Sequence, residues 1–188
     1  MIHAYDKSYL SAAQKNLARM LDYLVNDLHY PLETAWQWFL ISKMAFRFEQ
    51  GDCSVLVGLS GVELARAVLE QAGEAVPMQK TSYAYDRSPE YWTGWALAYY
   101  QWLTSLRFAE IEQAVPITKV RLLYTPYREM DVRQFADKMN ELYRAAKPET
   151  NLKALRALAG LSQSELAEQA DVPVRTIQQY EQRQKDIN

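Results

Sequence analysis

The side chains best suited to recognition chemistry lie near the end of the chain, in the run Val174-Arg-Thr-Ile-Gln-Gln179. An arginine can donate two hydrogen bonds to the edge of guanine, and a glutamine can bind adenine through its amide group. The methyl groups of valine and threonine can pack against the methyl group of thymine. The sequence therefore predicts that five residues read base edges: Val174, Arg175, Thr176, Gln178 and Gln179.

Three further polar residues flank this run, and we expect them to contact DNA phosphates. Gln163 would do so with its side chain and with the unpaired N–H groups at the start of a helix. Arg183 and Lys185 follow the run and would hold the phosphate backbone from its other end.

Short helices must present these side chains, and residues 151–188 predict three of them. Ser162 and Glu165 have the spacing of a capping box, which starts the second helix. A turn at 171–173 leads into the third helix, and Asp171 tolerates the left-handed backbone that such a turn requires better than most residues do. We expect the first helix to bury a stripe of leucines: Leu152, Leu155 and Leu158. We expect the other two helices and the turn to bury Leu166, Ala167, Val172, Ile177 and Tyr180.

Two short helices joined by a turn of three or four residues form the unit that places a helix in the major groove. The pattern here resembles the lambda-repressor/Cro-like helix-turn-helix in three runs: Leu161-Ser-Gln-Ser-Glu-Leu-Ala167, Val172-Pro-Val-Arg-Thr-Ile177 and Tyr180-Glu181. The resemblance implies sequence-specific binding to double-stranded DNA, usually as a homodimer on a palindromic site. It also implies a phosphate contact by Gln163 and base contacts by Val174, Arg175, Gln178 and Gln179.

This sequence departs from the family pattern in two places. Arg183 stands where the family often has glycine. The family domain has five helices, whereas the residues up to Asn188 reach about the start of the fourth, so the resemblance implies a partial domain, truncated at its C-terminus.

The whole chain also resembles a group of antitoxin-type bacterial regulators. The similar segments are Ser88-Pro-Glu-Tyr-Trp-Thr-Gly-Trp95 and Gln179-Tyr-Glu-Gln-Arg-Gln-Lys-Asp-Ile-Asn188. This resemblance implies a toxin-like protein partner in addition to DNA.

The composition of the chain changes near residue 148. All five Trp, all five Phe and twelve of the thirteen Tyr precede that position. Since proline disfavours helix in the residue before it, Lys147-Pro-Glu-Thr150 reads as a linker. The sequence predicts a partner-binding or dimerisation domain at 1–147 and a DNA-binding domain at 151–188.

The first of these domains reads as a helical bundle, which makes the predicted fold all-α. Apolar periodicity and helix-capping signals predict helices at about 8–28, 31–50, 60–73, 88–107, 108–114, 116–124 and 131–146, with a loop at 74–87. Residues 124–131 read as a polar turn.

Aromatic residues at 91–102 cover more of one helix than a single buried stripe requires. They form either the core of the domain or a docking surface for a partner or ligand; the candidates for such a surface are Tyr91, Trp92, Trp95 and Tyr99. A second alternative concerns residues 112–120, whose sequence is similar to 168–177. That segment is either a degenerate second helix-turn-helix or a chance likeness.

Charge and reactive residues restrict the function further. The chain has a net charge of −2 and a pI near 5.8, and residues 151–188 hold five basic and five acidic residues. This balance argues against indiscriminate nucleic-acid binding and favours two copies acting together.

His3, His29 and Cys53 are isolated in sequence, so we expect no metal, no cofactor and no enzyme activity. We expect a cytoplasmic protein without a membrane segment, because neither a signal peptide nor a long apolar run occurs.

Together these features predict a sequence-specific DNA-binding transcriptional regulator. The alternative is an antitoxin-type interaction module that neutralises a partner protein and autoregulates its operon.

Overall fold

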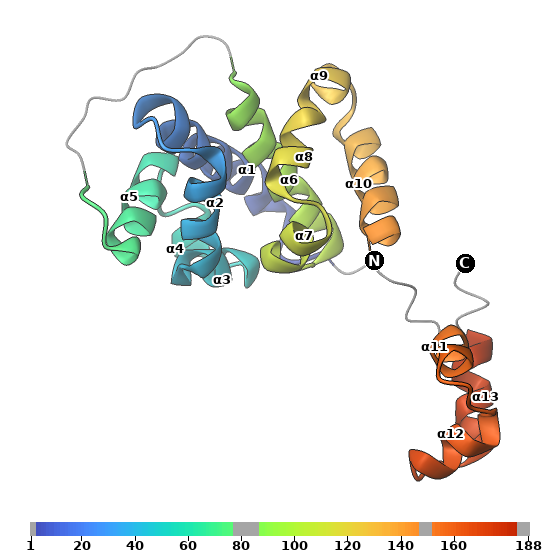
Figure 1. The fold of residues 1–188 in the computed structure, drawn as a ribbon. Coiled ribbons are helices and arrows are strands. Elements are labelled where there is room, and N and C mark those ends of the chain that lie inside the picture. Colours follow the sequence, from blue (N-terminus) through green and yellow to red (C-terminus); the bar gives the residue numbers. More distant parts are fainter. Residues whose placement is uncertain (1–2, 77–86, 147–151, 184–188) are drawn as a thin grey trace. The chain divides into compact units, whose positions relative to one another are not determined.

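A computed structural model describes residues 3–76, 87–146 and 152–183. It divides the chain into two compact units, residues 1–146 and residues 147–188, which we describe separately. The described residues form helices and no strand, which confirms the predicted all-α fold (Figure 1). None of the helices in these ranges is long and apolar enough to span a bilayer. The predicted linker at 147–150 lies outside the described residues.

Helix α1 (Lys7–Asp22) is the centre of the first unit. It contacts α6 (Pro89–Thr104) most extensively and α5 (Gly61–Ala72) next. In Figure 1, α2 (Leu32–Ile41), α3 (Lys43–Glu49), α4 (Cys53–Leu56) and α5 gather on one side of α1. On the other side are α6, α7 (Phe108–Ala114), α8 (Ile117–Leu122), α9 (Tyr124–Tyr127) and α10 (Val132–Ala146).

Glycine allows the close approach of α1 and α6. A Cβ atom on Gly94 would lie 2.6 Å from the carbonyl oxygen of Leu17 and 2.8 Å from Cα of Ala18. Only a residue without a side chain lets two helix backbones pass at this distance. Leu17, Leu21 and Leu97 are fully buried along the same contact.

Aromatic rings fill the core between α2, α3 and α7. Phe108 makes edge contacts with Trp36, Phe39 and Phe48, with ring centroids 5.4–5.7 Å apart. Such edge-to-face pairs are favourable beyond the area that they bury. They tie α7 to two helices that precede it by about sixty to seventy residues in the sequence.

The helix starts and stops follow the local signals in the sequence. Ser60 and Glu63 form the expected capping box, and Gly73 ends α5 with φ of 76°. The hydroxyl group of Ser88 accepts a hydrogen bond from the Tyr91 amide, and Pro89 occupies the first turn of α6. Short-range chemistry of this kind depends on neighbouring residues alone, so it can be read from the sequence.

Two of the predicted long helices differ from a single regular α-helix. The helix expected at 8–28 changes at Tyr23 into a π-helical turn, η1 (Tyr23–Asp27). The helix expected at 31–50 breaks at Ser42, whose ψ of 154° is extended and whose hydroxyl group donates to the carbonyl oxygen of Phe39. The prediction of one continuous helix at 31–50 was wrong, because apolar periodicity persists across Ser42 while the helical backbone does not. The helix predicted at 8–28 has the expected extent, since residues 7–27 are helical throughout and only the hydrogen-bonding pattern changes at Tyr23.

Smaller differences occur in the second half of the unit. Helix α6 ends at Thr104 rather than near 107, since Ser105 adopts a left-handed backbone with φ of 56°. The predicted helix at 116–124 is α8, and α9 follows it in place of part of the expected turn at 124–131. In the loop expected at 74–87, residues 77–86 lie outside the described residues.

Candidate nucleic-acid interface

The second unit contains α11 (Leu152–Leu158), α12 (Gln163–Gln169) and α13 (Val174–Arg183) among its described residues. Ser162 and Glu165 form the predicted capping box, with the Ser162 amide 2.6 Å from Oε2 of Glu165 and the Glu165 amide 3.1 Å from the serine hydroxyl. Hydrogen bonding of the Glu165 carboxylate by the hydroxyl group and the amide of Ser162 lowers the pKa of Glu165. Helix α12 therefore begins where the sequence signal places it.

The turn between α12 and α13 has the predicted backbone. Asp171 has φ of 51°, the left-handed conformation expected for it. The amide of Val172 donates to the carbonyl oxygen of Ala167, and the amide of Thr176 donates to that of Pro173. These bonds end α12 and begin α13 within four residues, which gives the compact corner of a helix-turn-helix.

The core of this unit is small. Ala167 and Ile177 are buried, with 2% and 6% of their surface exposed. Leu152, Leu161, Leu166 and Val172 are half-buried around them.

Three residues that were predicted to be buried are exposed, so those predictions were wrong. Leu155 is 54%, Leu158 is 91% and Tyr180 is 62% exposed. Each residue turns the helix by about 100°, so three residues turn it by about 300°, which is about 60° short of a full turn. A stripe of residues spaced three apart therefore moves around the helix by about 60° at each step. Leu158 therefore lies far around α11 from Leu152, and Tyr180 lies off the inward direction that Ile177 marks.

The predicted base-reading residues occupy α13. Arg175, Gln178 and Gln179 are exposed, Val174 is at the border of exposure with 36%, and Thr176 is half-buried. Arg175 and Gln179 are four residues apart, which places them on one face of the helix. That face is roughly opposite to Ile177, so the helix can present it while remaining packed on α12.

The predicted phosphate contacts are placed less completely. Gln163 is the first residue of α12 and is half-buried. Arg183 is the last residue of α13, and its side chain lies outside the described part of the structure, as does the whole of Lys185.

A polar network that sequence reasoning missed joins the three helices. Nε of Arg156 lies 2.8 Å from Oε1 of Glu181, and Nε2 of Gln163 lies 2.6 Å from Oε2 of the same carboxylate. Arg156 also donates to the carbonyl oxygen of Leu161 at 2.7 Å. The carboxylate raises the pKa of Arg156 above its ordinary value. One signal in the sequence was available: Glu181 is four residues after Ile177 and so shares its inward face.

The other predicted surface lies on α6 in the first unit. Trp92 is buried, with its ring against those of Tyr124 and Phe135. Tyr91, Trp95 and Tyr99 are half-buried and follow one another at intervals of four residues. They form a partly accessible stripe along one side of α6, beside the face at Gly94 that packs on α1.

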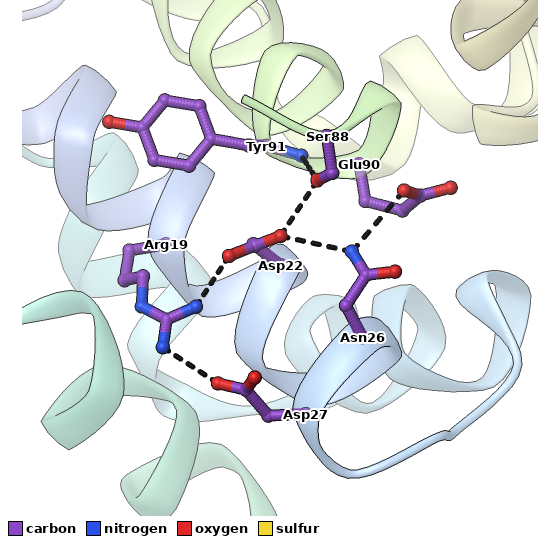
Figure 2. Close-up of polar contacts among 7 residues, drawn as sticks. All are labelled: Arg19, Asp22, Asn26, Asp27, Ser88, Glu90 and Tyr91. Atoms are coloured by element: carbon purple, nitrogen blue, oxygen red, sulfur yellow. Dashed lines mark hydrogen bonds and ion pairs between the residues drawn. The ribbon is translucent and has the colours of Figure 1, made fainter. Parts of the chain in front are cut away.

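A second polar network, in the first unit, lies at the start of α6 (Figure 2). Arg19 pairs with Asp22 and Asp27, and the hydroxyl group of Ser88 donates to Asp22 at 2.7 Å. Asn26 bridges Asp22 and Glu90.

Glu90, at the edge of this network, is also paired with Arg121 of α8. Burial opposes ionisation of the Glu90 carboxyl group, but hydrogen bonds from Arg121 and Asn26 outweigh it and lower its pKa. Because every charged group of the network has a partner of opposite sign, we interpret it as a tie between α1, η1, α6 and α8.

Residues 112–120 give no support to a second DNA-binding corner. The carboxylate of Glu112 accepts hydrogen bonds from the Ile117 amide at 2.8 Å and from the indole N–H of Trp36 at 2.9 Å. A negative charge at the start of α8 would repel a DNA phosphate. No group of three or more His, Cys, Asp or Glu residues that would suit a metal ion occurs among the residues described.

Comparison with known proteins agrees with this geometry in one region. A helix-turn-helix family model matches residues 152–188, the segment that contains α11, α12 and α13. This match supports DNA binding by that segment at a general level. A search of curated proteins and a search of solved structures each found no match.

Proposed function

We propose, from the helix-turn-helix at residues 152–188, that this protein is a sequence-specific DNA-binding transcriptional regulator. The observation that carries the proposal is the outward face of α13, where Arg175, Gln178 and Gln179 are exposed. Their helix packs on α12, and Ile177 is buried on its opposite side. A helix held in this way can enter the major groove without losing its packing.

The chemistry of this face suggests what it reads. Arg175 suits the O6 and N7 acceptors of guanine, and Gln178 or Gln179 suits adenine. Val174 presents methyl groups at the first turn of α13, where they can meet the methyl group of thymine. Thr176 is the least accessible of the five predicted readers.

Two copies of the chain acting on one DNA site fit the charge of the interface. The segment 151–188 has no net charge, and Glu181 already pairs with Arg156. Since most non-specific affinity for DNA comes from cations near phosphates, one copy would bind weakly. Two linked copies multiply their affinities on a site with two half-sites. A homodimer is therefore part of the proposal.

Selection of duplexes from a random pool by the wild-type protein, followed by gel-shift titration, tests the proposal. Arg175→Ala and Gln179→Ala should each weaken binding to the selected duplex by about five- to 150-fold, because each removes a bidentate base contact of about 1–3 kcal/mol. Arg144→Ala, at an exposed arginine of α10, is the matched control and should bind as the wild type does. Recovery of no preferred sequence, or equal binding by the Arg175→Ala variant, would refute the proposal.

The accessible aromatic stripe favours a protein partner as a second candidate function. Tyr91, Trp95 and Tyr99 are aromatic residues of the kind that concentrate binding energy at interfaces. An antitoxin-type module would bind a partner encoded beside it through this stripe. Co-expression with the neighbouring gene products should then yield a stoichiometric complex that Trp95→Ala disrupts and Trp38→Ala, at a half-buried tryptophan of α2, does not.

A further inference from the structure

The carboxylate of Glu181 accepts hydrogen bonds from one side chain of α11 and one of α12, the other two described helices of the second unit. The side chain of Glu181 is only 6% exposed. Arg156 of α11 reaches Oε1 at 2.8 Å and Oε2 at 3.3 Å, and Gln163 of α12 reaches Oε2 at 2.6 Å. A single carboxylate of α13 thus fixes the side chains at two other points of the fold.

The bond to Glu181 determines how Gln163 is presented. A carboxamide nitrogen carries two N–H groups in one plane, and the bond to the carboxylate uses one of them. Fixing this bond fixes the plane, and with it the direction of the second N–H group. A glutamine side chain without such a bond samples many rotamers, and ordering it costs entropy when a ligand binds.

We propose that Glu181 is a positioning residue for DNA binding, which holds the amide of Gln163 so that its second N–H group meets a DNA phosphate. This inference rests on the proposed function, because it assigns a role within the same interface. In this proposal Glu181 makes no DNA contact of its own. The network of Arg156, Glu181 and Gln163 then orients a DNA-binding side chain in addition to holding three helices together.

An acidic residue beside a phosphate contact would ordinarily oppose DNA binding. Here Arg156 balances the charge of Glu181 and is itself held by the carbonyl oxygen of Leu161 at 2.7 Å. The carboxylate therefore acts as a hydrogen-bond acceptor without adding net charge to the interface. Arg156, Glu181 and Gln163 form a chain that runs from α11 through α13 to α12.

The negative charge of Glu181 and its proposed positioning role predict opposite effects of the Glu181→Met substitution on DNA binding, so this variant distinguishes the two. Glu181→Met keeps the length of the side chain but removes its acceptor and its negative charge. If only charge mattered, loss of an acid would strengthen DNA binding. If Glu181 positions Gln163, the same change weakens binding by about fivefold, the value of one hydrogen bond. Glu168→Met, at an exposed acid of α12, is the control and should bind as tightly as the wild type or more tightly.

A double-mutant cycle shows whether the effect passes through Gln163. Fluorescence anisotropy would measure binding of the full chain to a labelled duplex that the wild-type protein enriched from a random pool. We expect Gln163→Ala to cost about fivefold and Glu181→Met to cost nothing more in the Gln163→Ala background. Equal losses in both backgrounds would indicate a purely structural role and overturn the inference, as would unchanged or tighter binding by Glu181→Met.

Circular dichroism would establish that each variant is folded. If Glu181→Met is not, Glu181→Asp takes its place, because it keeps the charge and draws the carboxylate back from Gln163. The same fivefold loss, absent in the Gln163→Ala background, is expected, and its absence from the wild-type background overturns the inference.

Two results distinguish failure of the proposed function from failure of the role proposed for Glu181. Failure of the wild-type protein to enrich any sequence would remove both proposals. Loss of binding by Arg175→Ala together with full binding by the Glu181 variants would remove this one alone.

Discussion

Replacement of Gly94 by alanine tests the packing on which the first unit depends. The added methyl carbon would lie 2.6 Å from the carbonyl oxygen of Leu17, and 2.8 Å and 2.9 Å from Cα and N of Ala18. All three are backbone atoms of α1, so none can rotate away as the end of a side chain would. The helices α1 and α6 must therefore separate.

The size of the effect follows from two opposing contributions. Overpacking a well-packed contact costs about 1–3 kcal/mol, and we take the upper value of about 3 because the contacts are to backbone. Alanine is favoured over glycine inside a helix by about 1 kcal/mol. The net loss of unfolding free energy is about 2 kcal/mol, which corresponds to a fall in Tm of roughly 4–8 °C for a protein of this size.

Urea denaturation followed by tryptophan fluorescence measures this loss directly. All five tryptophans precede residue 148, so the signal reports on the first unit. Gly73→Ala is the comparison, since a Cβ there meets no atom within 4 Å and only the positive φ of 76° is unfavourable for it. It should cost about 1 kcal/mol. A Gly94→Ala protein as stable as the wild type would refute the argument that close backbone approach at this glycine holds α1 and α6 together.

Three further predictions concern a half-buried acid and a strained turn. Burial raises the pKa of Glu112 above its ordinary 4.5, so the folded state retains a proton that the unfolded chain loses, and stability falls as the pH rises from 4.5 through the raised pKa. Urea titrations over that range should show a smaller fall for Glu112→Gln; an equal fall would exclude this carboxyl group as its source. At any pH the glutamine variant should be more stable than Glu112→Ala, because it still accepts from Trp36 and Ile117. Asp171 has φ of 51°. In Asp171→Gly, relief of the left-handed strain should outweigh the larger backbone entropy that glycine loses on folding, so the second unit should be stabilised by about 0.5 kcal/mol. Thermal unfolding monitored by circular dichroism would detect the change, and a destabilised variant would contradict it.

Features that depend on neighbouring residues were predictable from the sequence. The capping boxes at Ser60 and Ser162, the proline start of α6 and the left-handed Asp171 all involve atoms within a few residues of each other. Their energies are local and do not depend on how the rest of the chain folds. The corner between α12 and α13 is built from such signals, which is why the helix-turn-helix could be recognised before its structure was known.

Features that depend on distant residues were not predictable. Leu158 and Tyr180 are apolar or aromatic and resemble core residues, yet both are exposed. Which face of a helix is buried depends on where the other helices pack. The network around Glu181 joins residues 25 positions apart. The spacing from Ile177 places Glu181 on the inward face of its helix, but it does not identify Arg156 and Gln163 as its partners. The break at Ser42 depends on one hydroxyl group that bonds to the preceding turn, as serines in many unbroken helices also do.

The pairing of α1 with α6 also bears on the order in which the chain acquires structure. These two helices lie at opposite ends of a segment of roughly a hundred residues and form the most extensive contact of the first unit. During synthesis, the part of α1 that α6 covers stays exposed until α6 has left the ribosome, whereas α5 can cover another part of it earlier. Since exposed apolar surface of this kind is prone to aggregation, chaperone contact would be concentrated on the early, α1-containing part of the nascent chain. The helix-turn-helix emerges after this interval, with the domain that precedes it already able to close.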